Sequence, residues 1–410
     1  MSNQNRTMFG GRIDRGQVIN FVFNGKRYKG FHGDTLASAL LANDVHLVGR
    51  SFKYHRARGI LTAGSEEPNA IVQLGLGART EPNMRATEIE LYEGLEAASQ
   101  NCWPSVNYDI GSLNNILSSI FPAGFYYKTF KWPPSLWLFY EHFIRKAAGL
   151  GYSPTAKNPD RYEQKFYYCD LTIVGGGISG LLSALAAGRS GCSVLLIDEN
   201  PELGGYLLDY NFSINEKDGL KWIKNIVDEL YSMDNVRILK RTTAMGYYDY
   251  NYLTALEKVT NHCDQLSKTI PRERYWRVRS KKIVLAQGAF ERPLVFADND
   301  RPGIMMASAG KKYLSRYGVL PGKSVVLFTN NDHAYQTAFE FNDKGAKLSV
   351  VDTRENIDTR IQKKCDDLGI KLYLSSSIIS TSGNKKVNQI EVQKVDRKQN
   401  ELSGECITLD

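Results

Sequence analysis

The chain has 410 residues, of which 42% are hydrophobic and 23% are charged, with a formal net charge of +8 at pH 7. This composition is ordinary for a soluble globular protein, and the length suggests about two to four domains. No apolar run approaches the roughly 18–20 residues of a membrane-spanning helix, and the N-terminus lacks the apolar core of a secretory signal. We therefore expect a cytoplasmic protein with no membrane contact.

The positive charge is concentrated near the N-terminus. Residues 1–60 contain ten lysines and arginines but only three acidic residues. A basic region of this kind can bind nucleic acid, an anionic cofactor or an acidic partner protein. Because no nucleic-acid-binding motif accompanies it, we do not expect nucleic acid as a partner. His55 lies in this region, in SFKYHRARG, and we interpret the segment as a solvated basic loop rather than an anion-binding site.

Two elements near the N-terminus are predicted from local pattern. Residues 17–31 should form a β-hairpin, because apolar residues flank an Asn-Gly dipeptide at 24–25 that tolerates the positive φ of a tight turn. Residues 35–43 have the apolar spacing of a helix, behind a cap at Asp34 or Thr35.

Two strand-like runs follow, at residues 70–74 and 87–92. Hairpin, helix and strands together indicate an α+β module of the β-grasp, ferredoxin-like type over residues 1–98. Plant-type ferredoxins hold their iron–sulfur cluster with four cysteine thiolates, and this module contains no cysteine before Cys102. We therefore expect the fold without the cluster.

The cysteines and histidines give no metal-binding pattern. None of the six cysteines forms a CxxC pair, and none of the six histidines has the spacing of a metal ligand. We expect reduced thiols and no metal site. The cysteines are Cys102, Cys169, Cys192, Cys263, Cys365 and Cys406.

Residues 99–165 are dense in aromatic side chains, and prolines should interrupt any long helix or strand there. We interpret this segment as a packed connector. It either packs around the chain's own domains, which we favour, or forms an interface with another protein chain, where aromatic residues are enriched. The aromatic residues are Trp103, Phe121, Phe125, Tyr126, Tyr127, Phe130, Trp132, Trp137, Phe139, Tyr140 and Phe143.

From residue 168 the pattern becomes strand, glycine-rich loop, helix and strand. The run YYCDLTIV is an apolar strand, GGGISG is the loop, GLLSALAAGRSG is the helix and CSVLLID is the second strand. Gly175 would form the tight turn, Gly177 would let backbone approach a pyrophosphate, and Gly180 would let the helix pack closely on the strand. This order, with an acidic residue at the second strand's end, predicts a Rossmann-type dinucleotide site.

The acidic residue also selects the nucleotide. Asp198, with Glu199 as the alternative, would accept hydrogen bonds from a ribose, and a carboxylate there disfavours a 2′-phosphate, so NAD or FAD is expected over NADP. The helix N-terminus would bind the phosphates. A glycine-rich turn that binds no nucleotide fits this context less well. The expected cofactor-binding residues are Gly175, Gly176, Gly177, Ser179, Gly180, Asp198, Glu199, Gly204, Gly205 and Gly288.

Residues 323–354 follow the same order a second time, with strand SVVLFTN, helix HAYQTAFEFNDKG and strand AKLSVVD ending in Asp352. The intervening loop, TNNDHA, lacks glycine, so backbone cannot approach a pyrophosphate as closely. We expect a degenerate or lost second site.

The expected fold class is therefore a β-grasp domain followed by the two-dinucleotide-domain fold of FAD/NAD reductases. The expected parts are a ferredoxin-like domain, a connector, a Rossmann-type domain and a second, incomplete domain, spanning residues 1–98, 99–165, 166–320 and 321–410. A self-contained FAD-dependent NAD(P)H reductase would use this fold, but the TNNDHA loop and the lack of a CxxC pair count against it. No arrangement of catalytic residues stands out, so these stay unassigned.

Three stretches carry a resemblance to a known family: GRSFKYHRARGILTAGSEEPNA at 49–70, PAGFYYKTFKWP at 122–133, and VLAQGAFERPLVFADNDRPGIM at 284–305. The last is similar to the wider group of two-dinucleotide-domain flavoprotein reductases, and the first two are narrower. Along nearly its whole length the sequence resembles the N-terminal part of the α subunit of heterotetrameric sarcosine oxidases.

This resemblance implies an enzyme that oxidatively demethylates sarcosine and passes the one-carbon unit to tetrahydrofolate. It places the amine-oxidising FAD in a β subunit, and a covalent FMN where α meets β. In the α subunit it places NAD, which would here be held by Gly175, Gly177, Gly180 and Asp198. It implies β, γ and δ partner subunits, and an isolated α chain that does not oxidise sarcosine. Related amine- or opine-oxidising complexes remain an alternative.

The family's α subunit is more than twice as long as this chain. Its additional half is an aminomethyltransferase-like, folate-binding region. Because this sequence ends at GECITLD, before the strand that should return to the first dinucleotide domain, we expect a fragment of a longer product. Tetrahydrofolate would then bind only in the part that is not present.

Overall fold

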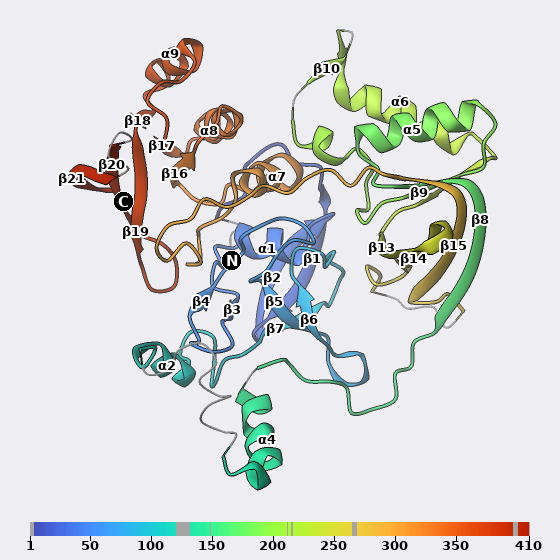
Figure 1. The fold of residues 1–410 in the computed structure, drawn as a ribbon, viewed down its shortest axis with the longest axis horizontal. Coiled ribbons are helices and arrows are strands. Elements are labelled where there is room, and N and C mark those ends of the chain that lie inside the picture. The colour runs from blue at the N-terminus through green and yellow to red at the C-terminus, as the bar shows by residue number, and fades with distance from the viewer. Residues whose placement is uncertain are drawn as a thin grey trace. The chain divides into compact units, whose positions relative to one another are not determined.

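The structure is a computed structural model, and it describes residues 4–119, 132–147, 149–210, 212–214, 216–264, 269–396 and 401–409. The chain forms two compact units (Figure 1). The first contains Met1–Asn158 and Glu291–Asp410, and the second contains Pro159–Phe290.

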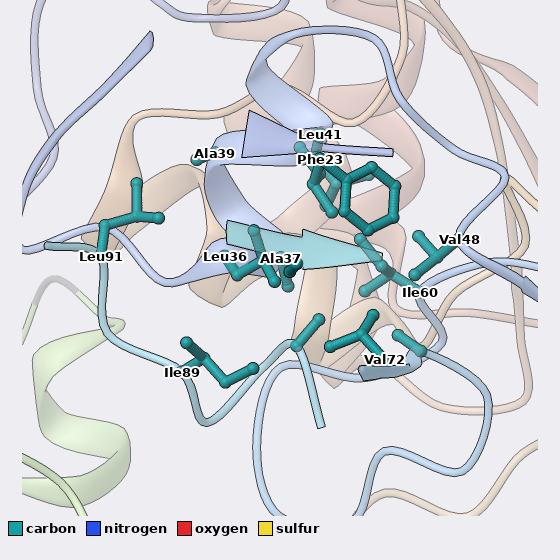
Figure 2. Packing of buried hydrophobic residues seen from close by; sticks show 14 of the residues in the cluster. Phe23, Leu36, Ala37, Ala39, Leu41, Val48, Ile60, Val72, Ile89 and Leu91 are labelled. Carbon is teal, nitrogen blue, oxygen red and sulfur yellow. The ribbon is translucent and has the colours of Figure 1, made fainter. Parts of the chain in front are cut away.

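The first unit begins with a five-stranded sheet of order β2-β1-β7-β5-β6. Helix α1, Leu36–Ala42, packs its buried residues into the same hydrophobic core as this sheet (Figure 2). The strands are β1 (Asp14–Phe23), β2 (Lys26–His32), β5 (Ile71–Leu74), β6 (Glu81–Arg85) and β7 (Glu96–Ser99).

The hairpin and the helix confirm the sequence predictions. Asn24 and Gly25 both have positive φ, 52° and 73°, which suits the tight turn between β1 and β2. Thr35 caps α1 by accepting a hydrogen bond from the Ser38 N–H, and Ser38 in turn accepts from the Thr35 N–H. This reciprocal pair satisfies two N–H groups that the helix start would otherwise leave unpaired.

The predicted strand at 87–92 is wrong. Its backbone bonds mainly to the start of α1, since Ile89 accepts from the Leu36 N–H at 2.8 Å and the Leu91 N–H donates to Asp34 at 2.9 Å. The alternating apolar residues Ile89 and Leu91 are buried as the pattern required. Burial alone does not decide which backbone groups a segment pairs with, and the sheet is completed by β6 and β7 instead.

The longest helix among the connector's described residues is α4 (Trp137–Ala147), which begins after Pro133 and Pro134 rather than being broken by them. Shorter elements precede it: η2 (Ile110–Ser112), α2 (Leu113–Ile116) and η3 (Pro134–Leu136). The described aromatic side chains include several that are exposed, and Trp132 is 80% exposed. Phe121, Phe125, Tyr126, Tyr127 and Phe130 lie outside the described residues.

The rest of the first unit confirms the second strand–helix–strand order. Strands β16, β17 and β18 form a parallel sheet, and β19, β20 and β21 form an antiparallel one. The elements are α7 (Ala307–Tyr317), β16 (Ser324–Thr329), α8 (His333–Asp343), β17 (Lys347–Asp352), α9 (Thr359–Asp367), β18 (Lys371–Tyr373), β19 (Ser376–Ser382), β20 (Gln389–Asp396) and β21 (Glu401–Leu409).

Helix α7 joins the core of the ferredoxin-like domain, where Tyr313 is fully buried together with Met306 and Ala309. Residues 291–320, which we expected to belong with the Rossmann-type domain, therefore lie in the first compact unit. The contact between α7 and this core joins segments that lie far apart in the sequence, so no local pattern could have predicted it. The domain boundaries given above remain a proposal.

The second unit contains one six-stranded sheet of order β12-β9-β8-β15-β14-β13. Strands β12, β9, β8 and β15 are parallel, and β15, β14 and β13 are antiparallel. Helices α5 (Ile178–Arg189) and α6 (Gly219–Tyr231) share a core with β8 and β9. The strands are β8 (Tyr162–Val174), β9 (Val194–Ile197), β12 (Val236–Leu239), β13 (Thr242–Tyr248), β14 (Tyr252–Lys258) and β15 (Glu273–Leu285).

The fold class predicted from sequence is therefore confirmed. Its two parts are a ferredoxin-like domain and a Rossmann-like domain, in that order along the chain. In the described ranges, none of the helices is long and apolar enough to cross a membrane.

Candidate functional site

The glycine loop of the second unit joins β8 to α5, and its first and last glycines are required by close packing. Gly175 has a φ of +105°, and a Cβ there would lie 2.3 Å from the Ala286 carbonyl oxygen. A Cβ on Gly180 would lie 1.8 Å from the Gly175 carbonyl oxygen. Neither position can carry a side chain without moving backbone, which is the role that the sequence pattern assigned to them.

Gly177 is different, because a Cβ built on it meets nothing within 4 Å. It is the N-cap of α5, with φ −73° and ψ −170°, a conformation that any residue can adopt. Its missing side chain therefore leaves open space in front of the helix N-terminus. Ser179 lies exposed in the first turn of the same helix. Free N–H groups beside open space can receive the negative charge of a phosphate.

Asp198 is buried, and its carboxylate is used by the chain itself. One oxygen accepts from the Gly176 N–H at 2.6 Å, and the other accepts from the backbone and side-chain nitrogens of Asn200 at 2.7 and 3.0 Å. Asp198 thus fixes the glycine loop to the end of β9. Glu199, the next residue, is exposed.

Two of the remaining predicted glycines, Gly204 and Gly205, contact the same loop. The Gly204 N–H donates to the Gly176 carbonyl at 2.9 Å, and a Cβ on Gly205 would lie 3.0 Å from the Gly177 Cα. Gly288, with a φ of +72°, follows β15 in the segment that also holds Ala289.

Sequence reasoning missed Tyr206. Its hydroxyl donates to the Ala289 carbonyl at 3.2 Å and so joins the segment after β9 to the segment after β15. The side chain is partly exposed, and tyrosine after a glycine pair carries no distinctive pattern, so only the fold reveals this contact.

In the second strand–helix–strand unit, the acidic residue that corresponds to Asp198 is Asp352, and an arginine binds it. Asp352 is fully buried and accepts from Arg354 at 2.8 Å and from the Tyr335 hydroxyl at 2.9 Å, while Arg354 also donates to Asp332 at 2.7 Å. The hydrogen bond to Asp352 raises the pKa of Arg354, and burial raises the pKa of Tyr335. The acidic residue that would face a ribose is therefore occupied by the chain, which agrees with the degenerate TNNDHA loop.

The interpretation of His55 as part of a solvated loop is corrected. Its Nδ1 lies 2.6 Å from the Asp109 carboxylate, the His55 side chain is 13% exposed, and that of Asp109 is fully buried. Asp109 comes from a segment more than fifty residues later, so the pairing is not visible in the local sequence. In the described part of the chain, no group of three or more histidine, cysteine, aspartate or glutamate residues could hold a metal ion.

Comparison with family models matches both domains. Residues 16–102 match a 2Fe-2S iron-sulfur cluster binding domain, and residues 170–260 match the FAD dependent oxidoreductase family. The matched ferredoxin-like segment contains a single cysteine, Cys102.

Three similar proteins bear on identity. The sarcosine oxidase α subunit of Rhizobium meliloti (strain 1021) is 50% identical over 384 residues, which are 93% of this chain and 38% of that protein. An opine oxidase subunit from Agrobacterium tumefaciens (strain Ach5) is 28% identical over 46% of this chain and 38% of its own length. A crystal structure of L-proline dehydrogenase from P.horikoshii shares the fold, with a TM-score of 0.58 at 18% identity over 98% of this chain and 60% of that one.

The chain thus spans a little over a third of the length of the sarcosine oxidase α subunits that it matches. The match to the Rhizobium protein covers nearly the whole of this chain at high identity, and it lies in that protein's N-terminal part. The chain is therefore a homologue of the N-terminal part of the sarcosine oxidase α subunit.

Proposed function

We propose that this chain is the NAD-binding part of a multi-subunit amine oxidase of the sarcosine oxidase type. The observation that carries the proposal is the open space at Gly177, in front of the N-terminus of α5 and bordered by Gly205. Gly175 and Gly180 are required by close backbone packing, but a Cβ at Gly177 would meet no atom within 4 Å. A bound pyrophosphate would explain the glycine at 177, because the phosphates approach the backbone closely there.

We assign the nucleotide contacts as follows. Gly177, Ser179 and the first turn of α5 receive the phosphates, and Glu199 accepts hydrogen bonds from the ribose hydroxyl groups. Asp198 positions the loop rather than the ligand, because its two oxygens already accept from Gly176 and Asn200. Either carboxylate disfavours a 2′-phosphate, so NAD is proposed over NADP. FAD has the same ADP-ribose half, and the matched family is FAD-dependent, so FAD is the competing ligand.

The chemistry that a nicotinamide or flavin ring supplies is hydride transfer. This chain's own residues bind and orient the nucleotide. We place amine oxidation in a partner β subunit that carries FAD and shares an FMN with this chain, and tetrahydrofolate binding in the C-terminal half of the family's α subunit. Partner β, γ and δ subunits and a cytoplasmic location belong to the same proposal.

The substrate is proposed from similarity, and the alternatives differ in kind. An opine oxidase complex would use the same chain type with another amine, because the substrate pocket would lie on a partner. A self-contained NAD(P)H reductase needs a second nucleotide site. The second strand–helix–strand unit has no glycine in its TNNDHA loop, and Arg354 lies beside both Asp352 and Asp332, so we do not favour the reductase.

The connector is the proposed docking surface for the β subunit. Trp132 is 80% exposed, Leu138 is 81% exposed and Phe139 is 60% exposed. Single exposed apolar side chains are normal on a protein surface, but several that lie close together mark interfaces, and Leu138 and Phe139 are neighbours on α4.

The test compares substitutions that the fold tolerates. A Gly177→Ala variant adds a methyl group that meets no protein atom, and Gly322→Ala is the control, since its Cβ would be 3.4 Å from its nearest neighbour, an ordinary contact. We expect unchanged melting temperatures for both and at least about tenfold weaker NAD binding for Gly177→Ala only. Equal NAD affinity in the two variants would contradict the proposed site.

A second pair of variants distinguishes the proposed roles of Glu199 and Asp198. Glu199→Ala should weaken NAD binding by about ten- to a hundredfold, the loss of a charge-assisted hydrogen bond. Asp198→Ala should instead act mainly by lowering the melting temperature, because it leaves the Gly176 and Asn200 N–H groups unpaired. A Glu199→Ala variant with normal NAD affinity would return the ribose contact to Asp198.

A further inference from the structure

One face of the second unit's sheet carries exposed aromatic rings and arginines that the dinucleotide site does not use. Strands β8, β15, β14 and β13 lie side by side there (Figure 1). Paired residues on neighbouring strands point to the same face, so the strand register identifies its members. We call it the Arg277 face, and its members include Phe166, Tyr168, Tyr248, Tyr252, Arg277 and Arg279.

The opposite face of the same strands is an ordinary core. Trp276 is 1% exposed and packs with Val278 and Leu253. Arg274 on that side pairs with two carboxylates, Glu163 at 2.7 Å and Glu257 at 2.8 Å. On this side the apolar side chains are therefore buried, and the charge of Arg274 is paired within the chain.

On the Arg277 face, by contrast, aromatic side chains are exposed. Phe166 is 64% exposed and Tyr168 is 73% exposed. The Arg277 guanidinium lies 5.4 Å from the centre of the Phe166 ring, and that of Arg279 lies 5.0 Å from the Tyr252 ring. Among the described residues, no carboxylate lies within ion-pair distance of either arginine, although Arg274, on the same strand, has two.

We infer that the Arg277 face is the binding surface for another protein chain that presents carboxylates to Arg277 and Arg279. Arginine and aromatic side chains are the residues most enriched at the energetic centres of protein interfaces. Stacking on a ring holds each guanidinium in place, so a carboxylate can bind it with little loss of side-chain freedom. The inference rests on the proposed function only in naming the occupant as a partner subunit.

Single-stranded nucleic acid is the other ligand that exposed aromatic residues and arginines on a sheet can bind. It binds by stacking bases on open ring faces. Here a guanidinium lies over one face of both Phe166 and Tyr252, and Tyr248 lies 5.8 Å from Tyr252 at a tilt of 38°. A base stacking on Phe166 or Tyr252 would have to displace or share the guanidinium that already lies there, so the observations favour a protein.

The experiment uses the full chain, purified from its own cells with the chains that accompany it. An Arg277→Glu/Arg279→Glu variant is compared with Lys221→Glu/Lys224→Glu, an equal charge change on the exposed side of α6 in the same unit. We expect the first variant to bind the partner chain about tenfold or more weakly, and the control to bind it as the wild type does. Both should keep the wild-type melting temperature and NAD affinity.

A photo-reactive phenylalanine analogue at Tyr168 gives an independent reading, with Tyr231 on α6, 56% exposed, as the matched position. Crosslinks from 168 to the partner, and none from 231, support the inference. Unchanged partner affinity in the Arg277→Glu/Arg279→Glu variant, or crosslinks to nucleic acid, would overturn it. If the wild-type chain purifies with no partner at all, the proposed function fails and the inference fails with it. If a partner is present and both variants still bind it normally, only the inference about the Arg277 face fails.

Discussion

Replacing Glu67 with glutamine should destabilise the first unit by about 3 kcal/mol. Glu67 is 1% exposed and follows α1 in the loop that would carry cluster ligands in a plant-type ferredoxin. One carboxylate oxygen accepts from the N–H groups of Asn69 and Ala70 at 2.8 and 2.9 Å. The other accepts from the N–H groups of Leu61 and Thr62 at 2.9 and 2.6 Å, and from the Thr62 hydroxyl at 3.1 Å.

The magnitude follows from what an amide can replace. Glutamine keeps one oxygen, so in its better orientation it still accepts from Leu61 and Thr62 but turns an NH₂ group toward the N–H groups of Asn69 and Ala70. Two charge-assisted hydrogen bonds are then lost, at about 1.5 kcal/mol or more each. In a unit of this size, 3 kcal/mol corresponds to a fall in melting temperature of roughly 6–12 °C.

The assay is thermal unfolding followed by hydrogen exchange at Leu61, Thr62, Asn69 and Ala70, whose amides should lose protection. The matched control is Glu66→Gln, because Glu66 is the neighbouring residue and is exposed. A Glu67→Gln variant that melts within about 1 °C of the Glu66→Gln control would refute the reasoning. It would mean that the loop is held by its apolar packing and not by the carboxylate.

Three other predictions follow from the chain's remaining features. Burial lowers the pKa of His46 below its ordinary 6.5, so on acidification the unfolded chain binds a proton at this histidine before the folded chain does. The free energy of unfolding should therefore fall as the pH drops below about 6.5, and His46→Gln should flatten that slope in denaturant titrations at several pH values. Because Cys102 is the sole cysteine in the matched ferredoxin-like segment, iron and acid-labile sulfide analysis of anaerobically purified protein should find no cluster; stoichiometric iron would contradict this. The isolated chain should not oxidise sarcosine, and Trp132→Ala/Trp137→Ala should weaken β-subunit binding by roughly 2 kcal/mol or more with an unchanged melting temperature; a lower melting temperature with normal binding would assign the two tryptophans to internal packing.

Local signals in the sequence predicted the elements that local chemistry determines. The Asn-Gly turn at 24–25 and the cap at Thr35 each depend on backbone and side-chain atoms within a few residues. The requirement for glycine at Gly180 is also local, because its Cβ would meet the Gly175 carbonyl oxygen in the same loop, whereas the close contact of Gly175 is with the Ala286 carbonyl oxygen after β15.

Long-range partners account for what the sequence could not predict. The pattern at 87–92 correctly marked Ile89 and Leu91 as buried but could not show that their backbone pairs with the start of α1. Asp198 has the spacing of a ribose ligand, yet its oxygens accept from Gly176 and Asn200, and spacing cannot distinguish a carboxylate that faces the ligand from one that holds the loop.

The most direct test of the central claim is the mass of the nucleotide released on denaturing the purified chain. We expect NAD, in an amount close to one per chain for the wild type and much reduced for Gly177→Ala. Release of NADP or FAD as the only nucleotide would contradict the NAD assignment. Release of no nucleotide, together with no binding of added NAD, would contradict the dinucleotide site itself.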